Sequence, residues 1–311
     1  MHRPASSSIT RRRGHYRKAI LSLAWISRLP LGLIHQLGGL IGWLVYALSP
    51  AYRARVRAHA ARAGLTPAQR RASVGHAGRM ALEMPWLWLR SQDRPLGPLV
   101  QWEDAAPIER ALAAGKGMVL LTPHLGCFEV LAMSFAERWG REAPLTVLYR
   151  PARQAWLSRW QLTARTRPGL HTAPATLAGV RQMLRALRRG ETLGMLPDQV
   201  PPQGMGEWVP FFGADAYTMT LAAKLVLQTG APWLLLWAER LSGGRGWLAH
   251  VHVGAPLPEL AGEEMEARVK ACAAAINREM EQLILRAPEQ YLWGYNRYKQ
   301  PRRPSAAEST P

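Results

Sequence analysis

The feature that most constrains the fold is a repeated order in the middle of the chain: a short apolar run, a polar residue at its end, then a helical pattern. The runs are too short for globular helices and indicate strands; they cover residues 117–121, 145–149 and 192–196. His124, Arg150 and Asp198 lie at or just beyond the three ends. Because sites in parallel sheets gather outside the carboxyl ends of strands, we expect these three side chains to share one edge.

The second half of the chain predicts an antiparallel edge on the same sheet. Residues 232–240 and 247–253 are strand-like and flank a Gly243-Gly244 turn, which is typical of a hairpin. A loop is expected from Val200 to Gly213, a helix from Thr218 to Thr229, and a long helix from Glu263 to Leu285. The chain is therefore predicted to be α/β, with a mixed, mostly parallel central sheet flanked by helices.

His124 and Glu129 are the candidate catalytic pair. His124 follows Thr122-Pro123 in the turn after the first strand, and Glu129 opens the next helix. A histidine can act as a general base near neutral pH, and a carboxylate within reach can orient it and stabilise the imidazolium. The same residues would also fit a solvated loop histidine and a glutamate that only complements the helix dipole.

The two cysteines give no sign of a disulfide framework or a metal site. Cys127 and Cys272 are far apart in the sequence, and no metal-ligand spacing surrounds them. We expect both thiols to be packing residues, with no metal and no cofactor.

The charge of the chain predicts an anionic partner. It has 40 Lys and Arg against 21 Asp and Glu, for a formal net charge of +19. Nucleic acid, an anionic membrane, a phosphorylated lipid and an acidic carrier protein all fit that charge. Thirteen Trp residues favour the membrane, because Trp is common at the bilayer interface. Nucleic acid is not expected, because the strand candidates lack basic residues interleaved with aromatic ones.

Residues 29–48 predict a membrane-anchoring helix. The segment is almost entirely apolar and long enough to cross a hydrocarbon core of about 30 Å. Four glycines and basic clusters on both flanks leave a helix lying in the interface as the alternative. The predicted division is a basic N-terminus with this helix (1–65), a catalytic domain (66–300) and a polar tail (301–311).

Several motifs in order resemble one enzyme family. They are His124-x4-Glu129, Tyr149-Arg150-Pro151, Pro197-Asp198-Gln199, Val209-Pro210-Phe211-Phe212-Gly213, Gly230-Ala231-Pro232 and the segment Pro288 to Trp293. From the membrane segment to about Pro301, the chain resembles the bacterial lipid A biosynthesis late acyltransferases, which transfer lauroyl and myristoyl groups and share the glycerolipid acyltransferase-like fold.

The resemblance implies transfer of a fatty acyl chain from acyl carrier protein to a hydroxyl of an anionic glycolipid, at the cytoplasmic face of the bacterial inner membrane. His124 would be the base and Glu129 its orienting acid. Arg150 would bind an acceptor phosphate or the developing oxyanion, unless it forms a structural ion pair. Asp198 and Gln199 would position the acceptor or buttress the site.

The sequence leaves the identity of the acceptor open. Residues 294–299, Gly-Tyr-Asn-Arg-Tyr-Lys, depart from the more basic run of many relatives. A phospholipid, an ornithine lipid or a glycosylated phosphoinositide is an alternative acceptor for the same chemistry. A basic, non-enzymatic membrane-binding protein is the alternative of another class.

Overall fold

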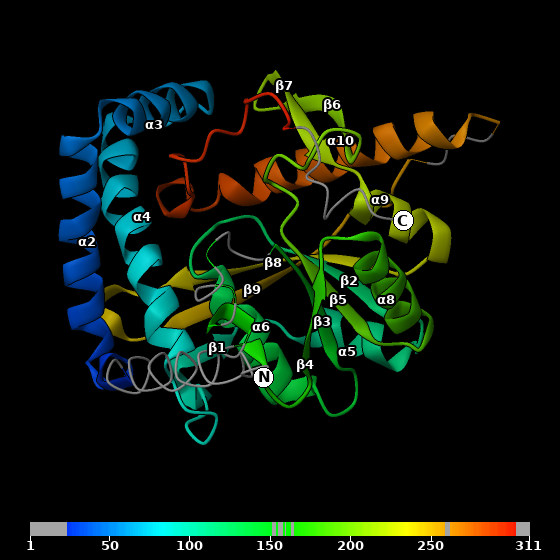
Figure 1. The fold of residues 1–311 in the computed structure, drawn as a ribbon, viewed down its shortest axis with the longest axis horizontal. Coiled ribbons are helices and arrows are strands. Elements are labelled where there is room, and N and C mark those ends of the chain that lie inside the picture. The colour runs from blue at the N-terminus through cyan, green and yellow to red at the C-terminus, as the bar shows by residue number, and fades with distance from the viewer. Residues whose placement is uncertain are drawn as a thin grey trace, which may run out of the picture.

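A seven-stranded sheet forms the centre of the computed structural model (Figure 1). From one edge to the other, its strands are β1 (Val100–Trp102), β9 (Trp247–Val253), β8 (Trp233–Arg240), β2 (Met118–Leu121), β5 (Thr192–Met195), β3 (Leu145–Tyr149) and β4 (Leu170–Pro174). Neighbouring strands are parallel, except that β8 and β9 form an antiparallel hairpin. The predicted α/β class, with its mostly parallel sheet and late hairpin, is confirmed.

The structure describes residues 24–150, 154, 158, 160–162, 165–258 and 262–302. Its α-helices are α2 (Leu31–Leu48), α3 (Pro50–Arg62), α4 (Pro67–Trp88), α5 (Ala106–Ala113), α6 (Phe128–Trp139), α8 (Leu177–Arg188), α9 (Leu221–Thr229) and α10 (Met265–Ile284). The sequence also predicts a helix over 152–165, and most of it lies outside the described residues. The predicted basic N-terminus and nearly all of the predicted polar tail lie outside them as well.

Helices cover both faces of the sheet because the central strands are apolar on both sides. In β2, Met118 and Leu120 pack into a buried cluster with α4, α5 and α6. Val119 and Leu121 point the other way, into a cluster with α8, α9 and α10. The buried members of both clusters are at most 9% exposed, and each fully buried aliphatic side chain contributes roughly 1.5–3 kcal/mol.

The sequence does not predict the strands β1 and β4, and a third region also differs from the prediction. Residues 206–219 form an antiparallel hairpin of β6 (Gly206–Phe211) and β7 (Ala214–Met219), where a loop and the start of a helix were expected. Thr218 is a buried strand residue, and its hydroxyl accepts a hydrogen bond from Asn277 at 3.1 Å. This tertiary contact satisfies the hydroxyl within a strand, so α9 begins only at Leu221.

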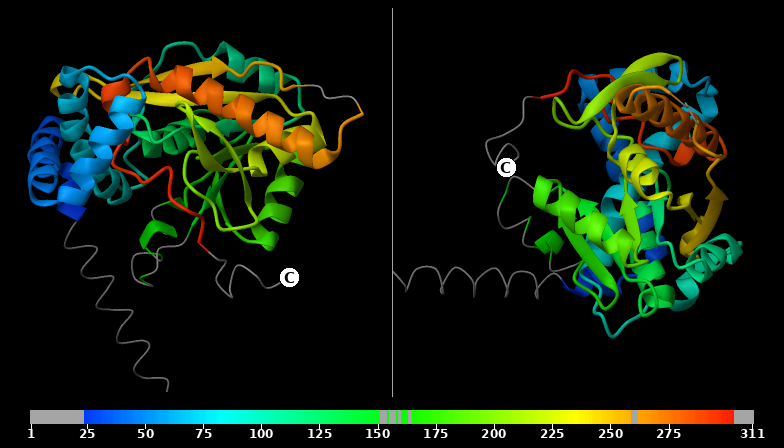
Figure 2. Two further views of the ribbon diagram at one scale, coloured as in Figure 1. Left: turned by 90° about the horizontal axis from the view of Figure 1, so that it is seen from above. Right: turned by 90° about the vertical axis from the view of Figure 1, so that its right-hand side faces the viewer.

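Helices α2, α3 and α4 gather at one end of the molecule (Figures 1 and 2). Glycines allow α2 and α4 to pack backbone against backbone. A Cβ on Gly38 would lie 2.7 Å from the Cα of Arg79, and one on Gly78 would lie 2.0 Å from the carbonyl oxygen of Gly38. The glycines that complicated the prediction of a membrane span are therefore packing residues, as in small-residue helix interfaces.

The outer face of α2 is apolar and exposed. Its 18 residues have a mean hydropathy of 1.5 and are 33% buried, so it is long and apolar enough to cross a membrane. Large apolar side chains point away from the protein; they are Leu33, Leu37, Leu40, Ile41, Trp43, Leu44, Val45 and Leu48. Length and composition alone do not separate a span from an interfacial or core helix.

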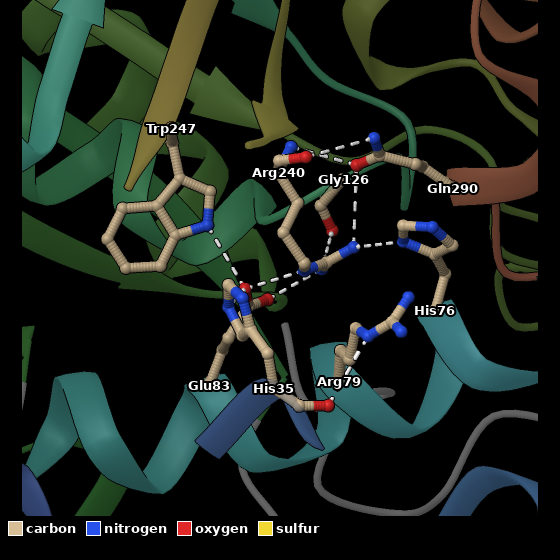
Figure 3. Close-up of polar contacts among 8 residues, drawn as sticks. All are labelled: His35, His76, Arg79, Glu83, Gly126, Arg240, Trp247 and Gln290. Carbon is tan, nitrogen blue, oxygen red and sulfur yellow. Dashed lines mark hydrogen bonds and ion pairs between the residues drawn. The ribbon is translucent and has the colours of Figure 1, made fainter. Parts of the chain in front are cut away.

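A buried ion pair joins α4 to the central sheet (Figure 3). Arg240, the last residue of β8, donates two hydrogen bonds of 2.6 Å to Glu83 of α4. His35 of α2 and the indole of Trp247 also bond to the Glu83 carboxylate, at 2.8 and 3.1 Å. Burial alone would raise the pKa of Glu83, but the charge and hydrogen bonds of Arg240 outweigh it and lower the pKa to about 2.

We predict that Gly38→Ala weakens the docking of α2 by about 1–3 kcal/mol, because the new methyl group collides with α4 backbone. Gly39→Ala is the matched control, because its nearest neighbour is the Arg79 side chain at 3.6 Å. Equilibrium unfolding in urea measures both variants. Equal stabilities would show that the helices are not held by close backbone contact.

We predict that Glu83→Gln lowers the free energy of unfolding by about 3–5 kcal/mol, because Arg240 is left buried without its counter-charge. The folded pKa lies below the usual 4.5, so this stabilisation is present above about pH 4.5 and is lost as the pH falls toward 2. In the exposed pair of Glu109 and Arg138, Glu109→Gln should cost about 0–1 kcal/mol. An equal loss in the two variants would contradict the role of the buried pair.

Candidate active site

His124 lies on a short loop between β2 and α6 that is fixed by backbone hydrogen bonds on both sides. The amide of Gly126 donates to the carbonyl of Gln290 at 3.0 Å, and the amide of Leu292 donates to the carbonyl of His124 at 3.1 Å. Gly126 has a φ of +60°, and a Cβ there would lie 1.8 Å from the carbonyl oxygen of Ala238 in β8. Only glycine fits this close approach, which sets the position of the histidine.

The buried ion pair supports the same loop. Arg240 donates a hydrogen bond from Nη2 to the carbonyl oxygen of Gly126 at 3.1 Å, and its backbone amide donates to the Gln290 side chain at 2.9 Å. Figure 3 shows Gly126 and Gln290 on one side of the Arg240 guanidinium and Glu83 below it. The guanidinium therefore links α4, β8 and the segment after α10 to the loop that carries His124.

Asp198 is the carboxylate that holds His124. Its two oxygens accept from Nδ1 of the ring at 2.7 Å and from the His124 backbone amide at 2.8 Å. Asp198 follows β5, which runs parallel to β2, so both residues lie beyond carboxyl ends of adjacent strands. Because the carboxylate accepts, Nδ1 carries the proton, and Nε2 is left as the basic nitrogen.

The surroundings of Asp198 keep it ionised. It is 2% exposed, and burial alone would raise its pKa. The charge of His124 and the two hydrogen bonds outweigh burial and lower the pKa of Asp198 below its usual value. Burial and this carboxylate raise the pKa of Tyr291 well above its ordinary range, so the phenol stays protonated beside Asp198.

Gln199 closes the other side of the imidazole. Its Nε2 lies 2.9 Å from Nε2 of His124, where an amide N–H can donate to the basic nitrogen. The predicted residues His124, Asp198 and Gln199 are thus brought together in one chain of hydrogen bonds. Any group that gives a proton to His124 must take the place of the Gln199 amide.

Glu129 is buried at the start of α6 but bonds to other partners. Its carboxylate accepts two hydrogen bonds from Arg165, at 2.8 and 2.6 Å, and one from the indole of Trp88 at 2.9 Å. Burial alone would raise its pKa, yet the Arg165 charge lowers the pKa overall. Within the described contacts Glu129 does not bond to His124, so a direct pairing of these two residues stays a prediction.

An apolar cavity of about 80 Å³ lies next to the loop that carries His124, and Thr122 and Phe128 of that segment line it. The rings of Phe128 and His124 are 4.8 Å apart between centroids. Glu129 and Arg165 are the charged residues of its wall, and the rest is mostly aliphatic side chains of the central strands and α6. The arrangement places the His124 imidazole near a hydrocarbon-lined space.

The other candidate residues lie apart from this chain of contacts. Arg150 directly follows β3, is exposed and does not line the apolar cavity. Cys127 is buried, and burial together with the charge of Glu83 raises its thiol pKa well above the ordinary value. Cys127 and Cys272 pack in separate clusters, one on each face of the sheet, as expected of packing residues.

Sequence reasoning missed Arg165, Trp88 and Tyr291. Arg165 and Trp88 are surrounded by similar arginines and tryptophans, so no spacing distinguishes them. Tyr291 belongs to a recognised motif, but only the folded chain brings it next to Asp198.

Comparisons with known proteins show the family of the chain. The model of the family described as bacterial lipid A biosynthesis acyltransferase matches residues 5–300. The lipid A biosynthesis lauroyltransferase of Escherichia coli (strain K12) is 27% identical over 234 residues, 73% of this chain and 69% of that protein. The lipid A biosynthesis palmitoleoyltransferase of the same strain is 26% identical over 70% of this chain and 66% of that protein. The lipid A biosynthesis myristoyltransferase of the strain is 24% identical over 63% of this chain and 58% of that protein. The chain belongs to the bacterial lipid A biosynthesis acyltransferase family and is an acyltransferase.

Proposed function

We propose that the protein transfers a fatty acyl group from an acyl carrier protein thioester to a hydroxyl of a lipid A precursor. The observation that carries the proposal is His124, held by Asp198 through Nδ1 and offering basic Nε2 beside an apolar cavity. The names of the similar E. coli proteins favour this acceptor. No covalent intermediate on the protein is needed.

In the proposed reaction, Nε2 of His124 takes the proton from the acceptor hydroxyl as its oxygen attacks the thioester carbonyl carbon. The tetrahedral intermediate then collapses, the carbon–sulfur bond breaks, and the imidazolium returns the proton to the departing thiolate. Asp198 stabilises the imidazolium and keeps the ring in the required tautomer. The acceptor hydroxyl displaces the amide of Gln199, which then bonds to the acceptor.

Glu129 acts through Arg165 in this proposal. The carboxylate orients the guanidinium on the cavity wall by two hydrogen bonds. A guanidinium fixed in this way can stabilise the oxyanion of the intermediate. Arg150, exposed beyond β3, is then the residue for an acceptor phosphate.

The proposed place of the reaction is the cytoplasmic face of the bacterial inner membrane. The exposed apolar face of α2 supports membrane attachment, by spanning or by lying in the interface. The net charge of +19 supports attraction of an acidic carrier protein and of an anionic glycolipid.

The direct test incubates purified full-length protein with acyl carrier protein thioesters and a lipid A precursor, and weighs the lipid products by mass spectrometry. We expect the precursor to gain one acyl group, and His124→Ala to lower the rate by about 10²–10⁴-fold. A phospholipid, an ornithine lipid and a glycosylated phosphoinositide are the matched acceptors. A mass gain in one of these alone would contradict a lipid A precursor as the acceptor. Full activity of His124→Ala would contradict His124 as the base.

We predict that Asp198→Asn lowers kcat by about 10²–10⁴-fold with little change in KM, because the ring loses its tautomer control and its counter-charge. Glu129→Gln keeps the contacts of His124 and should lower kcat by a smaller factor. Steady-state kinetics on both variants, with circular dichroism to verify folding, compares the two carboxylates. A larger loss in Glu129→Gln would make Glu129 the orienting partner of His124.

A further inference from the structure

A second cavity lies between α2, α4 and the turn of the β8–β9 hairpin. Its volume is about 520 Å³, and its lining shares no residue with that of the apolar cavity. Polar side chains in its wall include Gln36 on α2, His76 and Arg79 on α4, and Arg240 and Arg245 at the hairpin. Nothing in the proposed reaction uses this cavity.

The charge around this cavity is positive. Arg79, Arg240 and Arg245 line it, and Glu83 neutralises only Arg240, with which it forms its two short hydrogen bonds. Glu239 also lines the cavity and bonds to His250 at 3.0 Å; the three arginines outnumber the two carboxylates of Glu83 and Glu239. Arg79 and Arg245 are left as the cations that face the space.

The guanidinium of Arg79 has N–H groups that can donate hydrogen bonds to a ligand. Its Nε donates to the carbonyl oxygen of His35 at 3.3 Å, and among the described residues no hydrogen bond is made by its two Nη nitrogens. Figure 3 shows its guanidinium turned toward the imidazole of His76. Burial and the nearby charge of Arg240 lower the pKa of Arg79 by more than the charge of Glu83 raises it.

The start of α2 adds backbone donors beside the same cavity. Gly32 in its first turn lines the space, and Pro30 at the N-cap provides no side-chain cap. Early amides of a helix, together with the helix dipole, favour an anion. Leu33 and Leu37, next to Gly32 and Gln36 along α2, are exposed and apolar. An anionic group with hydrocarbon attached would match both features.

We propose that this cavity binds a phosphate group, held by Arg79, Arg245 and the first turn of α2. Guanidinium groups suit phosphate because they present several N–H donors in one plane. A phospholipid headgroup and inorganic phosphate share this chemistry. The apolar face of α2 provides a surface along which lipid chains can lie.

The test titrates full-length protein in detergent, at constant ionic strength, with inorganic phosphate or with dihexanoyl phosphatidylglycerol, and measures the thermal unfolding midpoint. Dihexanoylglycerol, which lacks the phosphate, is the matched lipid. We expect phosphatidylglycerol to raise the midpoint, and Arg79→Gln and Arg245→Gln each to weaken its apparent affinity about tenfold or more. Arg71→Gln, on the exposed surface of α4, should respond like the wild type.

Each outcome decides the proposal. Stabilisation by both phosphate compounds means that the anion is sufficient, and stabilisation by phosphatidylglycerol alone identifies the lipid headgroup. The proposal fails if neither compound stabilises the protein or if dihexanoylglycerol acts equally well. It also fails if Arg245→Gln, at an exposed position, keeps the wild-type affinity.

Discussion

The contact between Arg240 and Glu83 is the interaction on which the rest of the arrangement depends. It crosses from the last residue of β8 to α4, and the same guanidinium holds the carbonyl of Gly126 on the loop of His124. His35 brings α2 onto the same carboxylate. One buried pair therefore connects the apolar helix α2, the hairpin edge of the sheet and the loop that carries His124. Such a pair costs desolvation, and its many hydrogen bonds offset that cost.

The succession of strands and helices along the chain could be predicted largely from the sequence. Apolar runs such as 118–121 and 192–195 are buried on both faces, which leaves a continuous hydrophobic signal. The misses have a common cause. β1 has three residues, β4 is an edge strand, and β6 and β7 pair only with each other. Local composition says little about such strands, because tertiary contacts like that of Thr218 with Asn277 hold them.

The site was predictable to the level of residues but not of partners. His124, Asp198 and Gln199 were expected at neighbouring strand ends, and the parallel pairing of β2 with β5 puts them in contact. The expected partner Glu129 lies five positions from His124, but its carboxylate bonds to Arg165 and Trp88. Distance along the sequence does not show whether Glu129 or Asp198 bonds to His124, because Glu129 also has Arg165 beside it.

The central claim is that His124 is a base whose Nδ1 proton is held by Asp198. The most direct measurement is the ¹⁵N NMR spectrum of the His124 ring in full-length protein labelled at histidine. We expect a protonated Nδ1 and an unprotonated Nε2 at neutral pH, with the Nδ1 signal changed by Asp198→Asn and kept in Glu129→Gln. A proton on Nε2 instead, or a ring spectrum that changes only when Glu129 is replaced, would contradict the claim.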